Sequence, residues 1–455
     1  MSISENRIGA ESRPRFYIES LGCPKNTVDS TGIALLLQRR GYRSAASPKE
    51  ADVLIVNTCG FIALARGESL EALEALAQKR RPGQKIVAAG CWAQREPDRL
   101  LERVPEIDGV IGTRTWHALP DFLELLDQRP NERLIYTDDR DMVLPEEAGT
   151  SGYVVSGVSA FLKIADGCSR QCAFCAIPLI KGPTVSRSMD AIVEDARALQ
   201  DQGVLEINLI AQDTTHYGYD LGMKDALATL LELLVVEVPD IPWIRVLYTF
   251  PGYITPRLIE VFAEQPRVLP YVDIPLQHAH PDVLRRMRRP SAIERVRRTV
   301  ASVRDANPKV CLRTTFIVGF PGETDEEFAA LLEFVEEMRF DRVGAFTYSH
   351  EPGTPAAVLP DDVPEDVKAA RLDALMRTQQ PISLQKNRAL VGKRLPVLLE
   401  GAGEGLTIGR SYRDAPEIDG LVLVERDDLR LHRFVQVEIT EAMVYDLKGR
   451  VVEDD

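Results

Sequence analysis

The first third of the chain alternates short apolar runs with amphipathic stretches. Three apolar runs, "RFYIESLGC", "ADVLIVNTCGF" and "KIVAAGC", are each bounded by turn residues. Segments 30–42 and 68–81 between them have helical periodicity. This alternation predicts a parallel sheet with helical crossovers over residues 14–127. Residues 128–153 are polar and rich in turn formers, which predicts a linker with at most one short strand.

The middle of the chain repeats the same alternation on a larger scale. Helical patterns such as 190–202 and 325–340 separate the apolar runs. The six candidate strands are 161–167, 206–213, 243–250, 271–277, 310–320 and 342–349. Six strand–helix units predict a partial parallel (β/α)6 barrel over 154–383, with its chemistry at the carboxyl ends of the strands.

The last part has a different pattern. Short β-like runs broken by Gly, Asp and Pro occupy 386–452 and predict a small antiparallel barrel. A long helical stretch, 365–390, joins it to the middle part. The expected fold is therefore α/β, with three domains at 14–127, 154–383 and 386–452.

Composition narrows the class of protein. The 455 residues are 45% hydrophobic and 27% charged, as in ordinary globular proteins. No apolar run approaches the roughly 18–20 residues of a membrane span, and the first residues lack an apolar core, so we expect a cytoplasmic protein without a membrane partner. The net charge of −14 argues against a general nucleic-acid binder and suits a basic partner protein.

Each of the three N-terminal apolar runs ends in a cysteine, Cys23, Cys59 or Cys91. Ligands of open α/β sheets lie outside the carboxyl ends of the strands, so these thiols are candidates for one metal or cluster site. The alternative is three unrelated buried thiols, because free cysteine is a good small core residue. Cys311, inside an apolar strand, is interpreted as core.

A second group of cysteines follows the first strand of the predicted barrel. "CSRQCAFC" places Cys168, Cys172 and Cys175 within eight positions. A four-iron cluster normally takes four thiolates, so three would leave one iron open to a substrate or cofactor. A zinc site would need a fourth ligand, and the loop contains no histidine.

This CxxxCxxC motif after the first strand of a β/α barrel resembles the radical S-adenosylmethionine (SAM) superfamily. The resemblance implies a [4Fe-4S] cluster that binds SAM at its open iron and generates a radical able to abstract hydrogen from C–H bonds. Phe174 matches the aromatic position beside the adenine. Gly319 and Gly322, in "IVGFPGETDEEF", match the strand-five loop, where glycine lets the backbone approach the nucleoside closely; the alternative for these two residues is a simple β-turn. The usual Gly-Gly-Glu stretch after strand two is absent, and "AQDTT" occupies its place. From this position the resemblance implies Gln212 and Asp213 as contacts of the methionine group, although they depart from the family pattern.

The three-part organisation resembles the methylthiotransferases over nearly the whole chain. "SLGCPKNTVDS", "ADVLIVNTCGFI", "DIPLQHA" and "YSHEPGTPA" resemble the RimO subgroup, which modifies a ribosomal-protein aspartate. The transfer-RNA branch tends to have Gln or Lys where this chain has Pro24. The resemblance implies a second [4Fe-4S] cluster on Cys23, Cys59 and Cys91, and a TRAM-like C-terminal barrel.

The resemblance implies transfer of a methylthio group to the β-carbon of an aspartate of ribosomal protein uS12. It also implies a sulfur donor and a one-electron donor such as flavodoxin or ferredoxin. Two rivals stay open: a tRNA adenosine methylthiotransferase, and a two-cluster electron carrier or scaffold. Residues 384–455 hold 11 Lys/Arg and 14 Asp/Glu, a balance of −3 that favours a basic protein over tRNA.

Three further features have two interpretations each. Asp414, Glu417 and Asp419 of "DAPEIDG" either offer carboxylates to a basic substrate or form a solvated loop. His278 either orients a substrate or is a hydrogen-bonded structural histidine. The basic stretch "RRMRRP" at 285–290 is expected to cap a helix and cover a solvated face, rather than to bind nucleic acid.

Overall fold

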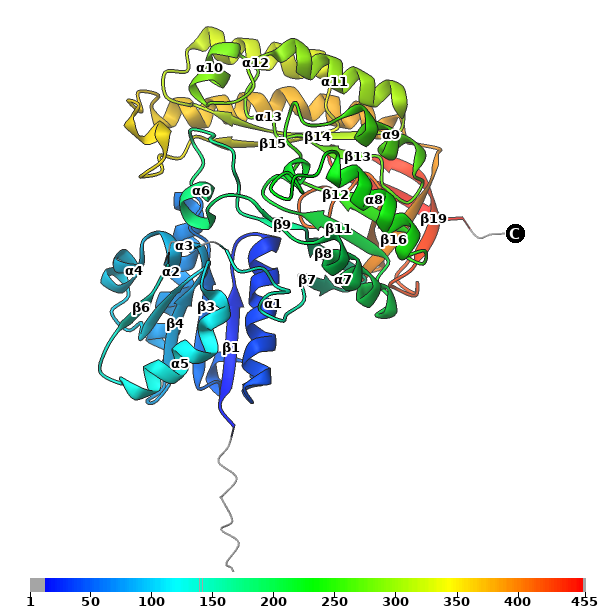
Figure 1. Ribbon diagram of the computed structural model, residues 1–455. Helices are drawn as coiled ribbons and strands as arrows, with labels where there is room; N and C mark the ends of the chain where they lie inside the picture. The colour runs from blue at the N-terminus through cyan, green and yellow to red at the C-terminus, as the bar shows by residue number, and fades with distance from the viewer. Residues whose placement is uncertain (1–12, 139, 141, 453–455) are drawn as a thin grey trace, which may run out of the picture. The chain divides into compact units, whose positions relative to one another are not determined.

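The computed structural model describes residues 13–138, 140 and 142–452. It divides into two compact units, Met1–Ser151 and Gly152–Asp455. The second unit contains both the central α/β part and the C-terminal β part (Figure 1). Among the described helices, none is long and apolar enough to cross a membrane.

The first unit contains a six-stranded parallel sheet in the order β2-β1-β3-β4-β5-β6, so the predicted parallel sheet is confirmed. The strands are β1 (Arg15–Ser20), β2 (Arg43–Ser44), β3 (Val53–Thr58), β4 (Lys85–Ala89), β5 (Gly109–Gly112) and β6 (Leu134–Tyr136). The helices are α1 (Pro24–Arg39), α2 (Ala63–Gln78), α3 (Gly90–Arg95), α4 (Pro97–Arg103) and α5 (Leu119–Gln128). Every residue of β3 is buried, as expected for a central strand with helices on both faces.

Helix α1 begins six residues before the predicted start. Pro24 occupies its first turn, where the missing N–H costs nothing, and the extended Cys23 precedes it as N-cap. Polar residues of the first turns, Asn26 and Asp29 among them, are buried. The apolar periodicity therefore starts later than the helix, because these turns face polar backbone at the end of the sheet.

The second unit is built on six parallel strands followed by helices, which confirms the partial barrel. The strands are β8 (Ser159–Lys163), β11 (Glu206–Ile210), β12 (Trp243–Val246), β13 (Tyr271–Asp273), β14 (Cys311–Val318) and β15 (Arg342–Thr347). They form two sheets, β12-β11-β8-β7 and β13-β14-β15, where β7 (Tyr153–Ser156) adds an antiparallel edge. The Thr249 N–H donates to the Asp273 carbonyl and connects the two sheets.

The barrel helices pack outside these strands around one large apolar core. They are α7 (Met189–Asp201), α8 (Ala226–Glu237), α9 (Pro256–Glu264), α10 (Pro281–Arg286), α11 (Ile293–Ala306) and α12 (Asp325–Met338). Helix α12 starts at a complete capping box formed by Thr324 and Glu327, which fixes the chain just after the β14 loop.

Helix α13 (Glu365–Arg388) leads from the barrel into a closed five-stranded barrel in the order β16-β17-β18-β20-β19. Its strands are β16 (Arg394–Gly403), β17 (Leu406–Arg410), β18 (Val422–Val424), β19 (Phe434–Ala442) and β20 (Leu447–Val451). Four of the five pairings are antiparallel, as expected, whereas β18 and β20 pair in parallel. The parallel pair closes the barrel and leaves no open edge among these strands.

The acidic "DAPEIDG" stretch does not offer all its carboxylates to a partner. Asp414 is 1% exposed and accepts a 2.6 Å hydrogen bond from Arg342 of β15. Asp419 accepts a 2.6 Å hydrogen bond from the Tyr271 hydroxyl of β13. Only Glu417 of the three is exposed. The expectation that Asp414 and Asp419 dock a basic substrate is therefore wrong, because both carboxylates face buried groups of the α/β barrel.

Candidate functional site

The loop cysteine set (Cys168, Cys172 and Cys175) follows β9 (Ala165–Asp166) at the carboxyl end of the barrel strands. Three backbone hydrogen bonds fix the loop. Cys168 N–H donates to Gly182 O at 3.0 Å, Ala173 N–H to Met287 O at 2.8 Å, and Ala356 N–H to Ala173 O at 2.8 Å. The loop is thereby held between the segments that follow β13 and β15.

The three thiols lie close enough to influence one another. Burial raises the pKa of Cys168 to about 11, and negative charge on Cys172 acts in the same direction. Burial, followed by charge on Cys172, also raises the pKa of Cys175. A metal or cluster binds thiolates, so its binding to this set would release protons from the thiols.

A buried carboxylate lies at the end of the first barrel strand. Lys163 and Lys181 each place their Nζ 2.9 Å from Asp166 Oδ2. Burial disfavours the ionised carboxyl, but the two ammonium groups outweigh it and hold the pKa of Asp166 well below its usual range. Gln212 donates from Nε2 to Asp166 Oδ1 at 2.9 Å, while its own Oε1 is buried without a hydrogen-bond partner among the described residues. Gln212 therefore has an acceptor left for a polar ligand.

Asp213, the second candidate from "AQDTT", has its hydrogen bonds satisfied within the chain. Its Oδ2 accepts from Arg170 Nε at 2.7 Å, and its Oδ1 accepts from the Thr215 hydroxyl at 2.5 Å. The Arg170 guanidinium also lies 3.7 Å from the ring centre of Tyr253. Asp213 thus ties the cysteine loop to the end of β11.

The glycine loop after β14 meets the cysteine loop in one apolar cluster. Phe174 packs against a buried group that includes Ala173, Met287 and Phe320. Gly319 has φ +71°, and a Cβ there would lie 2.3 Å from Lys368 Cγ, so only glycine fits. The sequence left two interpretations of this glycine, a close approach of the backbone to the nucleoside and a simple β-turn. The packing against Lys368 is an additional reason for its presence.

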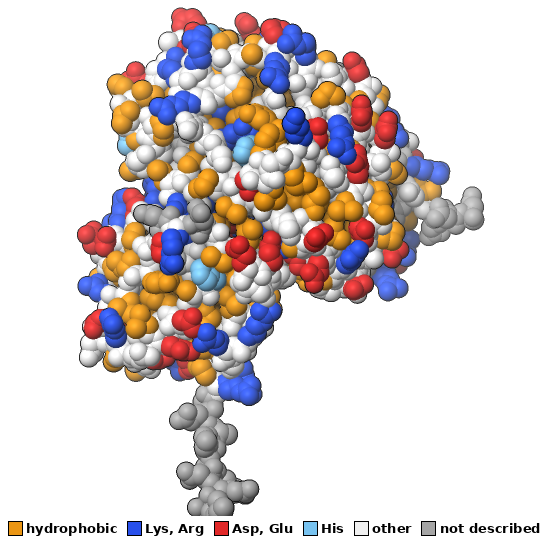
Figure 2. All heavy atoms as spheres, in the orientation of Figure 1, with side chains coloured by type: hydrophobic (Ala, Val, Ile, Leu, Met, Phe, Trp, Pro, Cys, Tyr) orange, Lys and Arg blue, Asp and Glu red, His pale blue; other side chains and the backbone are white. Residues whose placement is uncertain are grey.

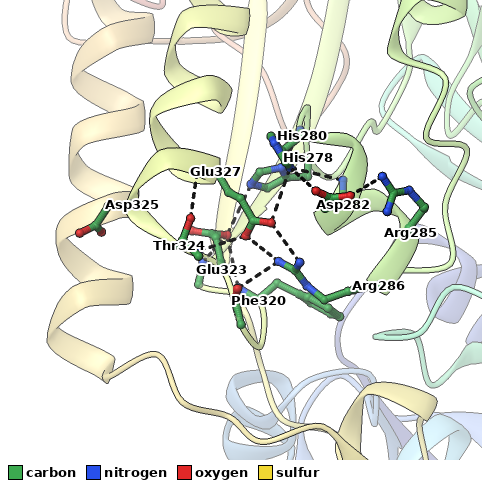
Figure 3. A network of polar contacts seen from close by, with 12 residues as sticks. His278, His280, Asp282, Arg285, Arg286, Phe320, Glu323, Thr324, Asp325 and Glu327 are labelled. Carbon is green, nitrogen blue, oxygen red and sulfur yellow. Dashed lines mark hydrogen bonds and ion pairs between the residues drawn. The ribbon is translucent and has the colours of Figure 1, made fainter.

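Figure 3 shows how the glycine loop is braced by side chains of α10 and α12. Arg286 donates to both carboxylate oxygens of Glu327, at 3.0 and 2.6 Å, and to Gly322 O at 3.1 Å. Glu323 Oε2 accepts from Gly319 N–H at 3.0 Å, and His278 Nε2 lies 3.5 Å from the same oxygen. These contacts hold the loop in one position.

Two of the sequence interpretations of this region are decided by the contacts. His278 is fully buried and its Nδ1 accepts from His280 N–H at 3.0 Å, which favours the structural histidine. In "RRMRRP", Arg285 is exposed and pairs with Asp282, as expected. Arg289 is instead buried, so the expected solvated face is wrong for it, whereas Arg286 is half-buried and pairs with Glu327. A charge run in the sequence does not tell which of its members are buried.

The N-terminal cysteine set (Cys23, Cys59 and Cys91) lies just beyond the ends of β1, β3 and β4, as predicted. Cys59 directly follows β3, Cys23 is the N-cap of α1 and Cys91 is the second residue of α3. These strands are neighbours in the sheet, so their carboxyl ends are adjacent. At Gly22, with φ +88°, an added Cβ would lie 2.9 Å from Cys59 Sγ. Burial raises the pKa of Cys59, and charge on Cys23 acts in the same direction.

Asn26 connects this set and was missed by sequence reasoning. Its side-chain amide donates to Leu21 O at 2.9 Å and Thr58 O at 3.1 Å. Its Oδ1 lies 3.6 Å from Cys91 Sγ. The only signal in the sequence was its place three residues after Cys23, within the turn that opens α1.

Three family models match successive parts of the chain. The Radical SAM superfamily model matches residues 162–335, the model of the uncharacterized protein family UPF0004 matches 15–112, and the TRAM domain model matches 391–452. The ribosomal protein uS12 methylthiotransferase RimO of Roseiflexus sp. is 45% identical over 96% of this chain and 97% of its own. The protein of the same name from Chloroflexus aurantiacus is 45% identical over 96% of this chain and 100% of its own.

The chain belongs to the RimO family of radical SAM methylthiotransferases. Membership of the radical SAM superfamily implies SAM and a [4Fe-4S] cluster as cofactors. In this RimO family member the loop cysteine set falls within the Radical SAM match, and the N-terminal cysteine set falls within the UPF0004 match.

The fold itself recurs in solved radical SAM structures. The radical SAM methyltransferase TsrM from Kitasatospora setae superposes with a TM-score of 0.55 at 14% identity, covering 87% of this chain and 77% of that chain. At this identity the likeness concerns the fold alone.

Cys311, which also lies in the Radical SAM match, is 0% exposed at the amino end of β14, and burial raises its pKa to about 12. Its interpretation as a core residue of this RimO family member is confirmed.

Proposed function

We propose that the chain adds a methylthio group to the β-carbon of an aspartate of ribosomal protein uS12. One observation carries the proposal: relatives named for this activity are 45% identical over nearly their whole length. The presence of two cysteine sets of three agrees with it, because radical formation and sulfur transfer call for two separate reactive centres.

We assign the loop cysteine set to a [4Fe-4S] cluster that binds SAM. When bound, this group supplies the radical that abstracts hydrogen from an unactivated C–H bond. The donor set fits it: three thiols of one short loop, without a fourth cysteine or a histidine in that loop, leave one iron open. Gln212 offers its buried Oε1 to SAM, and the apolar cluster around Phe174 and Phe320 keeps water from the site.

We assign the N-terminal cysteine set to a second [4Fe-4S] cluster that carries sulfur. The thiols follow three adjacent parallel strands, and Asn26 fixes the turns around them. Three thiolates again leave one iron for an external sulfur atom. A sulfur donor must renew that atom after each turnover, and a one-electron donor such as flavodoxin or ferredoxin must reduce the clusters.

The charge of the C-terminal barrel bears on the substrate. Its segment 384–455 carries a balance of −3, and the face of the molecule in Figure 2 mixes Lys and Arg with Asp and Glu. Binding of tRNA relies on Lys and Arg contacts with phosphates, whereas a segment of net negative charge attracts a basic ribosomal protein. A protein substrate is therefore favoured over the adenosine of tRNA.

The experiment is to delete the gene and to analyse both candidate substrates from the same cells by mass spectrometry. We expect uS12 to lose one methylthio group while tRNA nucleosides stay unchanged, and plasmid-borne wild-type gene to restore the group. Loss of a methylthioadenosine from tRNA with unchanged uS12 would support the tRNA enzyme. No change in either substrate would support an electron carrier or scaffold.

A further inference from the structure

A buried arginine, Arg289, lies beside the loop cysteine set. It lies just after α10 and is 8% exposed. Its Nη1 is 3.6 Å from Cys172 Sγ, and its Nη2 donates to Pro275 O. Its guanidinium carbon lies 4.1 Å from the ring centre of Phe250.

The charge of Arg289 is not balanced by a carboxylate. Three other arginines near the site have acidic partners: Arg170 pairs with Asp213, Arg286 with Glu327 and Arg371 with Glu323. For Arg289, by contrast, the described residues provide no carboxylate within ion-pair distance. Removing a cation from water without a counter-charge costs several kcal/mol, so an arginine kept in such a place needs a negative group from elsewhere.

The nearest group that becomes negative is the sulfur of Cys172. A [4Fe-4S] core of charge +2 on three thiolates has a net charge of −1, and one added electron makes it −2. An N–H donor and a positive charge at the ligand sulfur stabilise the more negative, reduced form. The ring of Phe250 holds the guanidinium from one side, which limits its access to water.

We propose that Arg289 tunes the cluster on the loop cysteine set: it donates a hydrogen bond to Cys172 sulfur and raises the reduction potential. The step concerned is the transfer of one electron from an external low-potential donor to the cluster, in which no bond forms and no proton moves. Arg289 is thus a positioning residue that makes the cluster reducible by such a donor. This inference depends on the cluster assignment of the proposed function and not on its substrate.

The test is an electron paramagnetic resonance titration of the reconstituted full-length chain without SAM. The triple Ala variant of the N-terminal cysteine set serves as background, so that one cluster is observed. We expect Arg289→Gln to disfavour reduction by at least tenfold, which for a one-electron couple is a shift of about 59 mV to more negative potential. Arg285→Gln, an exposed arginine of the same segment, is the matched control and should leave the potential unchanged.

Arg289→Lys keeps the charge but loses the planar guanidinium. The reduction potential of its cluster should therefore lie between that of Arg289→Gln and that of the unsubstituted background. If Arg289→Gln fails to hold iron, the lysine variant alone decides: a lowered potential supports the proposal and an unchanged one overturns it. The proposal would also be overturned if Arg289→Gln bound its full complement of iron and its cluster had the same reduction potential as the unsubstituted background. Because no substrate is added, these results are independent of whether uS12 or tRNA is modified.

Discussion

Glu206 joins the α/β barrel to the C-terminal barrel, and its replacement by Gln gives the sharpest test of the packing described above. Glu206 lies at the start of β11 and is 0% exposed. Its carboxylate accepts from Arg410 Nη2 at 2.5 Å and from Arg245 Nε at 3.0 Å. Arg410 belongs to β17, so the contact crosses from one barrel to the other.

The size of the effect follows from the pKa of Glu206. Burial alone would raise this pKa, but Arg410 and Arg245 outweigh it and lower the pKa from 4.5 to about 2. At about 1.36 kcal/mol per pKa unit, this shift corresponds to roughly 3 kcal/mol of stability at neutral pH. Breaking a buried pair by removing one partner costs about 3–5 kcal/mol, because the remaining charge stays buried. We therefore expect Glu206→Gln to destabilise the second unit by about 3 kcal/mol or more.

The assay is amide hydrogen exchange, followed by mass spectrometry, over a urea series. Peptides from β11 and β17 should lose protection at lower urea in Glu206→Gln than in the wild type. Glu400→Gln is the matched control, since Glu400 also contacts Arg410 but its side chain is 30% exposed. This substitution should lower the free energy of unfolding by about 1 kcal/mol or less. If both variants lost protection from exchange at the same urea concentration, or if Glu206→Gln kept the protection of the wild type, the reasoning would be refuted.

The same pair predicts a dependence on pH. Because the pKa of Glu206 is lower in the folded chain than in the unfolded chain, its contribution is fully present above about pH 4.5. It is lost as the pH falls toward about 2, where the folded carboxyl takes up its proton. The difference in stability between wild type and Glu206→Gln should therefore shrink over this range and stay constant above it.

Further predictions concern the cysteine sets and the glycine loop. Anaerobic reconstitution should give about eight irons per chain. The triple Ala variant of either cysteine set should bind about half as much iron, and Cys311→Ala should bind as much as the wild type. An unchanged iron content in the N-terminal variant would contradict a second cluster. The triple Ala variant of the N-terminal set should still cleave SAM to 5′-deoxyadenosine under reduction, measured by chromatography, whereas the loop variant should not. Gly319→Ala should lower the thermal midpoint more than Gly322→Ala, because both have positive φ but only Gly319 abuts Lys368; equal midpoints would contradict this.

Much of the fold could be predicted from the sequence because strands and helices alternate with clear periodicity. The sequence missed β2 and β5, which are strands of two and four residues with too few positions to show a period, whereas β6 lies in the linker where one short strand was allowed. It also placed the start of α1 too late. The pattern of apolar and polar residues misplaced this start, because Asn26 and Asp29 are polar and yet buried against the end of the sheet.

The candidate site shows a similar limit. The two cysteine sets were predictable for different reasons. A short loop keeps Cys168, Cys172 and Cys175 close together, whereas Cys23, Cys59 and Cys91 follow strands that are neighbours in a parallel sheet. The partners of charged groups were not predictable, since they come from distant positions. Asp414 was expected on the surface but pairs with Arg342, 72 residues away. Arg289 read as part of a solvated basic run but lies beside Cys172.

The central claim is that this chain methylthiolates a ribosomal protein and not tRNA. In the direct measurement, the reconstituted chain is incubated with SAM, a sulfide source and a reductant. Unmodified uS12 and unmodified tRNA are present together in the same reaction. Tandem mass spectrometry then locates the product. We predict one methylthio group on an aspartate β-carbon of uS12, absent with either triple Ala variant; a methylthioadenosine in tRNA with unmodified uS12 would contradict the account.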